Sequence, residues 1–309
     1  MKIVYMGTPD FAVPALRGLC DSSYEVSAVV TQPDKAKDRG KKIQFTPVKE
    51  TALEYGIPVL QPEKVKGNEE FFAELSAAAP DLIVVAAYGR ILPPAILELP
   101  RLGCVNIHAS LLPKYRGAAP IHRAIIDGEE TTGVTLMYMA EGMDTGDMIA
   151  KAETPIGDKT VAELHEELAG MGTELLLAQL PLIEAGTNSR TPQDDALATH
   201  APMIFKQDCF VDFHQRPERI KRLIQGTNSW PVAHTMYQGQ SVKLWEAEVL
   251  DGETEAGDGT ILAVDKSGMT VAAAGGRILI RKLQFPGKRA MSVEDYIKGN
   301  KIEIGAVLG

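Results

Sequence analysis

The residues best suited to chemistry lie close together near the middle of the chain. Asn106 and His108 are two positions apart at the end of residues 103–108, an apolar run that predicts a strand. Alternate residues of a strand point to the same face, so both side chains would project together. A carboxamide and an imidazole placed in this way can hydrogen-bond a developing oxyanion. The alternative is structural, with Asn106 capping a turn and His108 packed in a partly polar core.

The elements around this pair predict where it lies. Strands and helices alternate through residues 1–185, which favours a doubly wound, Rossmann-like α/β domain with a mostly parallel sheet. The expected strands are 2–6, 26–31, 57–60, 82–88, 103–108 and 134–139, and the expected helices are 11–20, 48–55, 69–79, 119–127 and 160–184. Ligands of open α/β sheets bind beyond the carboxyl ends of the strands, where Asn106 and His108 are expected.

The sequence changes character after residue 185. Residues 186–205 have the composition of a linker, rich in Thr, Asp, Ala and Pro. Residues 206–309 begin with one expected helix, 217–225, and continue as short apolar runs between glycines. That spacing predicts a small antiparallel β-barrel of the oligonucleotide-binding type.

Composition excludes several classes of protein. The chain has no apolar run of about 18 residues, so we expect no membrane span. Its N-terminus lacks the features of a signal peptide. The three cysteines are far apart and never form C-x-x-C, which indicates a reducing cytoplasm rather than a disulfide framework. The remaining histidines show no ligand spacing, so we expect no metal site.

Asn106 and His108 belong to a longer motif. They are followed by S-L-L-P-K-Y-R-G at 110–117. This segment resembles the hallmark of the formyltransferases that use 10-formyltetrahydrofolate. Other segments resemble the same family in order and spacing: M-G-T-P-D-F at 6–11, T-Q-P-D at 31–34, D-R-G-K-K at 38–42, V-V-A-A-Y-G at 84–89, G-M-D-T-G-D-M at 142–148 and N-S-W-P at 228–231. The resemblance covers essentially the whole chain.

The resemblance implies three catalytic residues, Asn106, His108 and Asp144. Alone, an Asp between glycines is usually a turn residue. Beside His108, the carboxylate of Asp144 would orient the ring and favour its protonated form. Asp144 would also accept the proton of an attacking amine, directly or through water. The amine is itself the nucleophile, so Ser110 is not expected to be a catalytic serine.

The resemblance also implies a folate site. Ser110, Leu111, Leu112 and Pro113 would form the folate-binding turn, with the apolar residues as a wall for a flat ring. Val85, Tyr88 and Leu92 would form the opposite wall, although core packing explains these three equally well.

The acceptor is predicted from two further features, a basic loop and the presence of a second domain. Residues 34–42 carry five cations and two anions, and within the family the equivalent loop contacts the acceptor stem of a tRNA. We therefore expect Arg39, Lys41 and Lys42 to contact initiator methionyl-tRNA, together with Lys206 in the second domain. A solvated basic loop is the alternative. We expect a monomer.

Three other functions are compatible with parts of this pattern. Relatives that formylate a 4-amino-sugar nucleotide share S-L-L-P-K-Y-R-G and a related second domain. Glycinamide ribonucleotide formyltransferase has the catalytic domain alone, so the length of this chain disfavours it. A non-catalytic nucleotide-binding protein is poorly supported, because the first turn lacks G-x-G-x-x-G and all three catalytic candidates are present.

Overall fold

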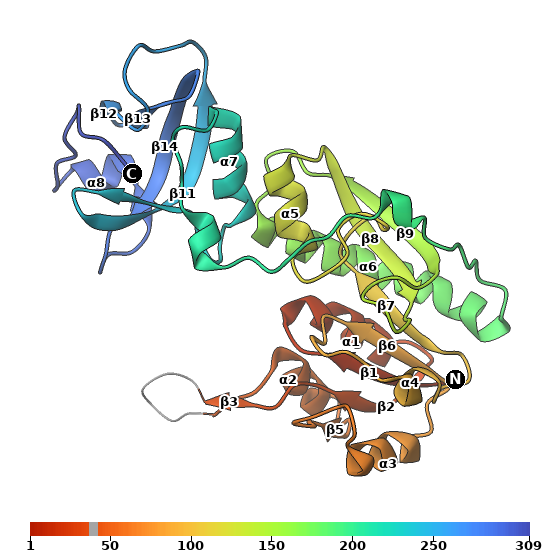
Figure 1. Ribbon diagram of the computed structural model, residues 1–309. Coiled ribbons are helices and arrows are strands. Elements are labelled where there is room, and N and C mark those ends of the chain that lie inside the picture. The colour runs from red at the N-terminus through yellow and green to blue at the C-terminus, as the bar shows by residue number, and fades with distance from the viewer. Residues whose placement is uncertain (37–42) are drawn as a thin grey trace. The chain divides into compact units, whose positions relative to one another are not determined.

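The computed structural model describes residues 1–36 and 43–309 (Figure 1). These residues form two compact units. The first contains residues 1–120, 132–154 and 165–201, and the second contains residues 121–131, 155–164 and 202–309.

A seven-stranded sheet forms the centre of the first unit, in the order β5-β2-β1-β6-β7-β8-β9. Strand β1 pairs in parallel with β2 and β6, and β6 pairs in parallel with β7, whereas β7 and β8 are antiparallel. The predicted mostly parallel sheet is therefore confirmed. The strands are β1 (Lys2–Gly7), β2 (Glu25–Val30), β5 (Val59–Leu60), β6 (Leu82–Ala86), β7 (Cys104–His108), β8 (Thr131–Tyr138) and β9 (Met148–Pro155). A separate pair, β3 (Lys35–Ala36) and β4 (Ile43–Gln44), is antiparallel.

Two of the helices that accompany this sheet begin after a residue whose side chain caps them. Thr46 accepts a hydrogen bond from the backbone N–H of Lys49 before α2, and Asn68 accepts one from Phe71 before α3. Such side-chain caps satisfy N–H groups that have no partner within the helix. The helices are η1 (Asp10–Ala12), α1 (Val13–Cys20), α2 (Pro47–Glu54), α3 (Glu69–Ala77), α4 (Pro94–Leu97), α6 (Val161–Ala185) and η2 (Asp195–Leu197).

Helix α6 lies very close to the strand that carries Asn106 and His108. A Cβ atom at Gly172 would lie 2.6 Å from Cγ2 of Ile107 in β7 and 3.4 Å from Cγ1 of Val134 in β8. Glycine at this position therefore permits a helix-to-sheet approach that any larger residue would obstruct.

The second unit is built on an antiparallel sheet, as expected for the C-terminal part. Its order is β10-β11-β14-β13-β12, with β15 paired to β14. The strands are β10 (His234–Tyr237), β11 (Gln240–Leu250), β12 (Ile261–Asp265), β13 (Gly268–Ala273), β14 (Gly276–Gln284) and β15 (Met291–Ser292). The helices are α5 (Pro120–Asp127), η3 (Lys206–Cys209), α7 (Pro217–Gly226) and α8 (Val293–Ile297). Residues from α7, α8 and the strands share one buried apolar cluster.

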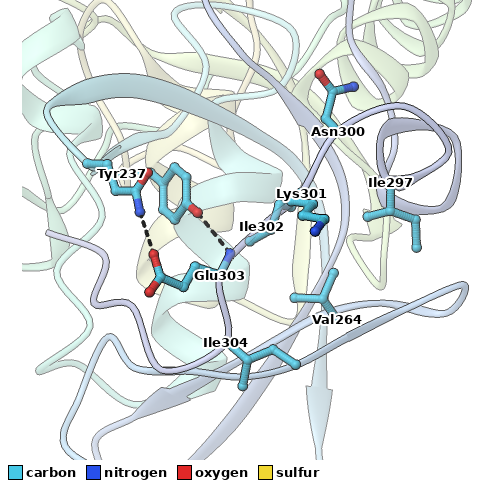
Figure 2. Close-up of a pocket in the computed structure, with 9 residues that line it drawn as sticks. Tyr237, Val264, Ile297, Asn300, Lys301, Ile302, Glu303 and Ile304 are labelled. Atoms are coloured by element: carbon cyan, nitrogen blue, oxygen red, sulfur yellow. Dashed lines mark hydrogen bonds between the residues drawn. The ribbon is translucent and has the colours of Figure 1, made fainter.

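A shallow cavity of about 540 Å³ opens on the second unit. Figure 2 shows Tyr237, Val264 and Ile304 among its lining residues. The Tyr237 hydroxyl accepts a 2.9 Å hydrogen bond from the backbone N–H of Glu303, and Gln238 donates one of 2.9 Å to the Glu303 carboxylate. None of the predicted site residues lines this cavity.

Candidate active site

The candidate site lies where neighbouring parallel strands end. Asn106 in β7 is in register with Val85 in β6, so the loops that follow the two strands begin side by side. The loop after β7 contains the S-L-L-P-K-Y-R-G segment, and the loop between β8 and β9 contains Asp144. The structure thus brings the three predicted catalytic residues to one edge of the sheet, within the first unit.

His108 is buried, with 6% of its surface exposed, and both of its ring nitrogens face oxygen atoms. Nε2 lies 2.9 Å from the backbone carbonyl oxygen of Tyr115. Nδ1 lies 3.6 Å from Oδ2 of Asp144. A carbonyl oxygen only accepts hydrogen bonds, so Nε2 must carry the proton.

Asp144 is held by backbone groups in an uncommon conformation. Its φ is +54°, a left-handed value that costs free energy for any residue except glycine. The backbone N–H of Gly117 donates a 2.8 Å hydrogen bond to Oδ2. Within the described part of the chain no group hydrogen-bonds Oδ1, so one carboxylate oxygen is fixed and the other is available to accept a proton.

Asn106 is half-buried. No hydrogen bond joins its carboxamide to any other described residue, in contrast to His108 and Asp144. Buried and half-buried polar groups normally have a partner, which can be protein, water or ligand. The Asn106 carboxamide can therefore donate to an oxyanion without breaking an existing contact.

The predicted folate turn is fixed by polar contacts. The Ser110 hydroxyl donates a 2.7 Å hydrogen bond to the carbonyl of Lys114. The buried Thr135 hydroxyl donates to the carbonyl of Ser110 at 2.7 Å and accepts from the N–H of Leu112 at 3.1 Å. Leu112 is fully buried, whereas Leu111 and Pro113 are half-buried. Leu112 thus anchors the turn, and its two neighbours remain partly accessible.

The other predicted folate residues, Val85, Tyr88 and Leu92, belong to the apolar core of the first unit. Burial raises the pKa of the Tyr88 hydroxyl to about 12. The carbonyl of Tyr88 accepts hydrogen bonds from Thr8 at 3.2 Å and from Gln32 at 2.9 Å. The three side chains therefore pack into the core, whereas Ala87, Arg90 and Ile91 of the same loop are exposed.

The predicted tRNA contacts are less well described. Arg39, Lys41 and Lys42 lie outside the described residues. Lys206 begins η3 in the second unit, where it is exposed.

The sequence did not point to three features of the site. The carbonyl of Tyr115 and the N–H of Gly117 act through backbone atoms, which carry no signal in residue type. The third is Gln193, which donates to the carbonyl oxygens of Asp144 and Gly146, both at 2.8 Å, and accepts from Arg116 at 3.0 Å. It lies in a segment whose composition predicts only a linker.

Neither a metal-binding cluster nor a membrane-spanning helix is found among the residues that the structure describes. No group of three or more His, Cys, Asp or Glu side chains in ranges 1–36 and 43–309 is arranged to hold a metal ion. No helix in those ranges has both the length and the apolar character needed to cross a membrane.

Family models match nearly the whole chain. A model described as "Formyl transferase" matches residues 1–180, and one described as "Formyl transferase, C-terminal domain" matches residues 203–301.

Full-length relatives have high identity to this chain. A protein of Acetivibrio thermocellus named methionyl-tRNA formyltransferase is 51% identical over 311 residues and covers 100% of both chains. A protein of Bacillus subtilis with the same name is 47% identical, over 100% of this chain and 98% of that one.

Solved structures share the fold at lower identity. A methionyl-tRNA formyltransferase from Clostridium thermocellum has a TM-score of 0.56 at 17% identity, over 82% of this chain and 95% of that one. The sugar 3N-formyl transferase WlaRD has a TM-score of 0.66 at 17% identity, over 94% and 99%. HypX from Aquifex aeolicus, solved with tetrahydrofolic acid, has a TM-score of 0.63 at 21% identity, over 97% of this chain and 47% of that one.

Proposed function

This chain belongs to the formyl transferase family, and we propose that it transfers a formyl group from 10-formyltetrahydrofolate to the amino group of methionyl-tRNA. The chain is an enzyme, and its product is N-formylmethionyl-tRNA for translation initiation. The observation that carries this conclusion is the match to methionyl-tRNA formyltransferases at 51% and 47% identity over the whole chain. That the enzyme acts as a monomer in the cytoplasm stays a prediction.

The acceptor separates this proposal from its nearest rival. A formyltransferase that acts on a 4-amino-sugar nucleotide would share the catalytic residues and much of the fold. The sugar enzyme among the structural relatives is only 17% identical, so it supports the fold alone. The full-length relatives that act on methionyl-tRNA therefore decide between the two acceptors.

The chemistry needs an oxyanion donor and a proton acceptor. The amine attacks the formyl carbon, a nitrogen–carbon bond forms, and negative charge develops on the formyl oxygen. Asn106 would hydrogen-bond that oxygen through its unpartnered carboxamide, and His108 would stabilise it by its charge. Asp144 would accept the proton that the amine loses, through its free Oδ1. The bond between the formyl carbon and the folate nitrogen then breaks, and the proton that Asp144 accepted would pass to that nitrogen, which releases tetrahydrofolate.

The residues present fit a folate co-substrate. 10-Formyltetrahydrofolate would supply the formyl carbon, and the face of its flat ring would suit the partly accessible Leu111 and Pro113. Ser110 and Leu112 would hold the turn in shape through their contacts with Lys114 and Thr135. Val85, within β6, and Tyr88 and Leu92, in the loop after it, would form the opposite wall.

The test is a direct competition between acceptors. Purified enzyme is given 10-formyltetrahydrofolate with initiator Met-tRNA or with a 4-amino-sugar nucleotide, and formyl transfer to each is measured. We expect rapid formylation of the tRNA and none of the sugar above background. Transfer to the sugar nucleotide at a higher kcat/KM than to the tRNA would overturn the proposal.

A further inference from the structure

The segment that follows helix α6 runs against both loops of the site. We call residues 191–201 the strap. At one end, Thr191 and Met148 exchange two backbone hydrogen bonds of 2.9 Å. At the other end, the N–H of Arg116 donates to Thr199 at 2.9 Å, and the N–H of Ala201 donates to Arg116 at 2.7 Å. The strap is thus attached to the loop after β7 and to the start of β9.

Gln193 is half-buried in a strap that is mostly exposed. Its Nε2 donates to the carbonyl oxygens of Asp144 and Gly146, each at 2.8 Å. Its Oε1 accepts a 3.0 Å hydrogen bond from Nε of Arg116. One carboxamide therefore uses both of its N–H groups on the loop that carries Asp144 and its oxygen on the loop after β7.

Arg116 lies between the two backbone groups that hold the catalytic candidates. Its neighbour Tyr115 accepts from His108, and its other neighbour Gly117 donates to Asp144. The guanidinium is buried and also donates a 2.8 Å hydrogen bond to Asp195 in the strap. A displacement of Arg116 would therefore change the setting of both His108 and Asp144.

The loop of Asp144 requires such support. Asp144 adopts a left-handed φ of +54°, which persists only where the surroundings hold it. At Gly146, a Cβ atom would lie 1.9 Å from the carbonyl oxygen of Tyr138, so the loop has no room to relax in that direction.

We propose that Gln193 is a positioning residue, which fixes the Asp144 carboxylate relative to His108 and thereby sets kcat. The inference rests on the proposed function, because Asp144 is there the acceptor of the amine proton. Gln193 does not touch the reacting atoms and acts through Asp144. A small displacement of a proton acceptor is enough to slow a reaction strongly.

Two substitutions distinguish the role of the carboxamide N–H groups from that of its oxygen. Gln193→Leu keeps the size of the side chain and removes all three hydrogen bonds. Gln193→Glu keeps the shape and the acceptor for Arg116, but has no N–H for the two carbonyl oxygens. We expect both to lower kcat by about 10-fold to 100-fold, with KM for Met-tRNA and for folate changed by less than about threefold.

Asp195→Asn is the matched control. Asp195 belongs to the same strap and contacts the same guanidinium, but it does not touch the loop of Asp144. Asparagine keeps an oxygen that can accept from Arg116, so the guanidinium should stay in place and kcat should stay within about twofold of wild type.

A double-mutant cycle provides the decisive readout. If Gln193 acts through Asp144, then Gln193→Leu in an Asp144→Ala background should change kcat by less than about twofold. A structural role would give the same fold-change in both backgrounds, and that result would overturn the inference. So would Gln193→Glu with wild-type kcat. An inactive wild type would instead contradict the proposed function, which keeps the two failures distinct.

Discussion

Asn106 differs from His108 and Asp144 in having no group that holds it. Backbone atoms of the loop after β7 contact both His108 and Asp144, at 2.9 Å and 2.8 Å. The Asn106 carboxamide makes no hydrogen bond to any described residue. A polar side chain that makes no hydrogen bond within the protein contributes little to the stability of the folded state, so its role lies in binding.

We therefore expect Asn106→Ala to lower kcat by about 10²-fold or more, the scale of losing an oxyanion donor. The free energy of unfolding should change by less than about 0.5 kcal/mol, because no hydrogen bond is lost. Formyl transfer at saturating substrates and urea unfolding measure the two quantities. Wild-type turnover in this variant would remove Asn106 from the mechanism.

Asn68→Ala is the matched control and should show the opposite pattern. Asn68 caps helix α3 by accepting a 3.0 Å hydrogen bond from the N–H of Phe71. Loss of such a cap costs about 1 kcal/mol of stability. Turnover should be unchanged, because Asn68 belongs to no loop of the site.

At the residue scale, the sequence was enough to predict where the candidate site lies but not which groups support it. Asn106 and His108 could be assigned to one strand end, because side chains alternate along a strand and ligands bind beyond strand ends. The role of Gln193 could not be predicted, since a contact between carbonyl oxygens and a distant glutamine leaves no pattern in either segment. Tyr88 shows what an apolar run does not predict. Such a run predicts that a residue is buried, but it does not distinguish a core residue from one that lines a ligand site.

At the scale of elements, the approach of α6 to β7 sets the position of the catalytic strand. Gly172 lies in the middle of α6, where glycine is intrinsically unfavourable compared with alanine. The 2.6 Å distance from its ideal Cβ position to Ile107 explains why a larger residue does not fit. Ile107 lies between Asn106 and His108, so a larger side chain at position 172 that displaced Ile107 would also displace both candidate catalytic residues.

Gly172→Ala should therefore destabilise the protein by about 1–3 kcal/mol through overpacking, despite the gain in helix propensity. We also expect a lower kcat, because Asn106 and His108 would shift with Ile107. Gly170→Ala in the same helix is the control. Nothing lies within 4 Å of its ideal Cβ position, so alanine there should stabilise by about 0.5–1 kcal/mol and leave kcat unchanged. Equal effects of the two substitutions on thermal unfolding and turnover would contradict this view of the packing.

The elements that could be predicted are those with strong local patterns. Strands β2, β6 and β7 are apolar runs, and α6 is a long amphipathic segment, so all four were expected close to their observed positions. Strand β10 and helix α8 were not expected. The four residues of β10 have too little pattern, and the short α8 depends on its Ser292 cap. The antiparallel pairing of β8 with β7 depends on tertiary contacts, which the local sequence does not predict.

At the scale of the whole molecule, the charge of −9 requires an explanation in an enzyme that acts on a polyanion. Residues 1–199 carry 18 Lys and Arg against 28 Asp and Glu, which gives −10, and residues 200–309 carry 14 against 13, which gives +1. The acidity therefore belongs to the N-terminal part. Binding of tRNA depends on local basic groups and not on the average charge, so a few cations should account for most of the electrostatic attraction.

The salt dependence of catalysis tests whether residues 34–42 supply those cations. We expect KM for Met-tRNA to rise steeply with salt in the wild type, because phosphate contacts release counterions. Lys41→Ala with Lys42→Ala should make that slope shallower by about two, one for each lost contact. Arg39→Ala should lower kcat/KM for Met-tRNA while KM for folate stays unchanged. Lys2→Ala is the control, because it also removes one positive charge. Lys2 pairs with Glu25 at the amino end of β1, opposite the strand ends that carry the site. If wild type and the double lysine variant have the same salt slope, these two lysines do not contact the tRNA. Other cations must then bind its phosphates, and Lys206 is the next to test.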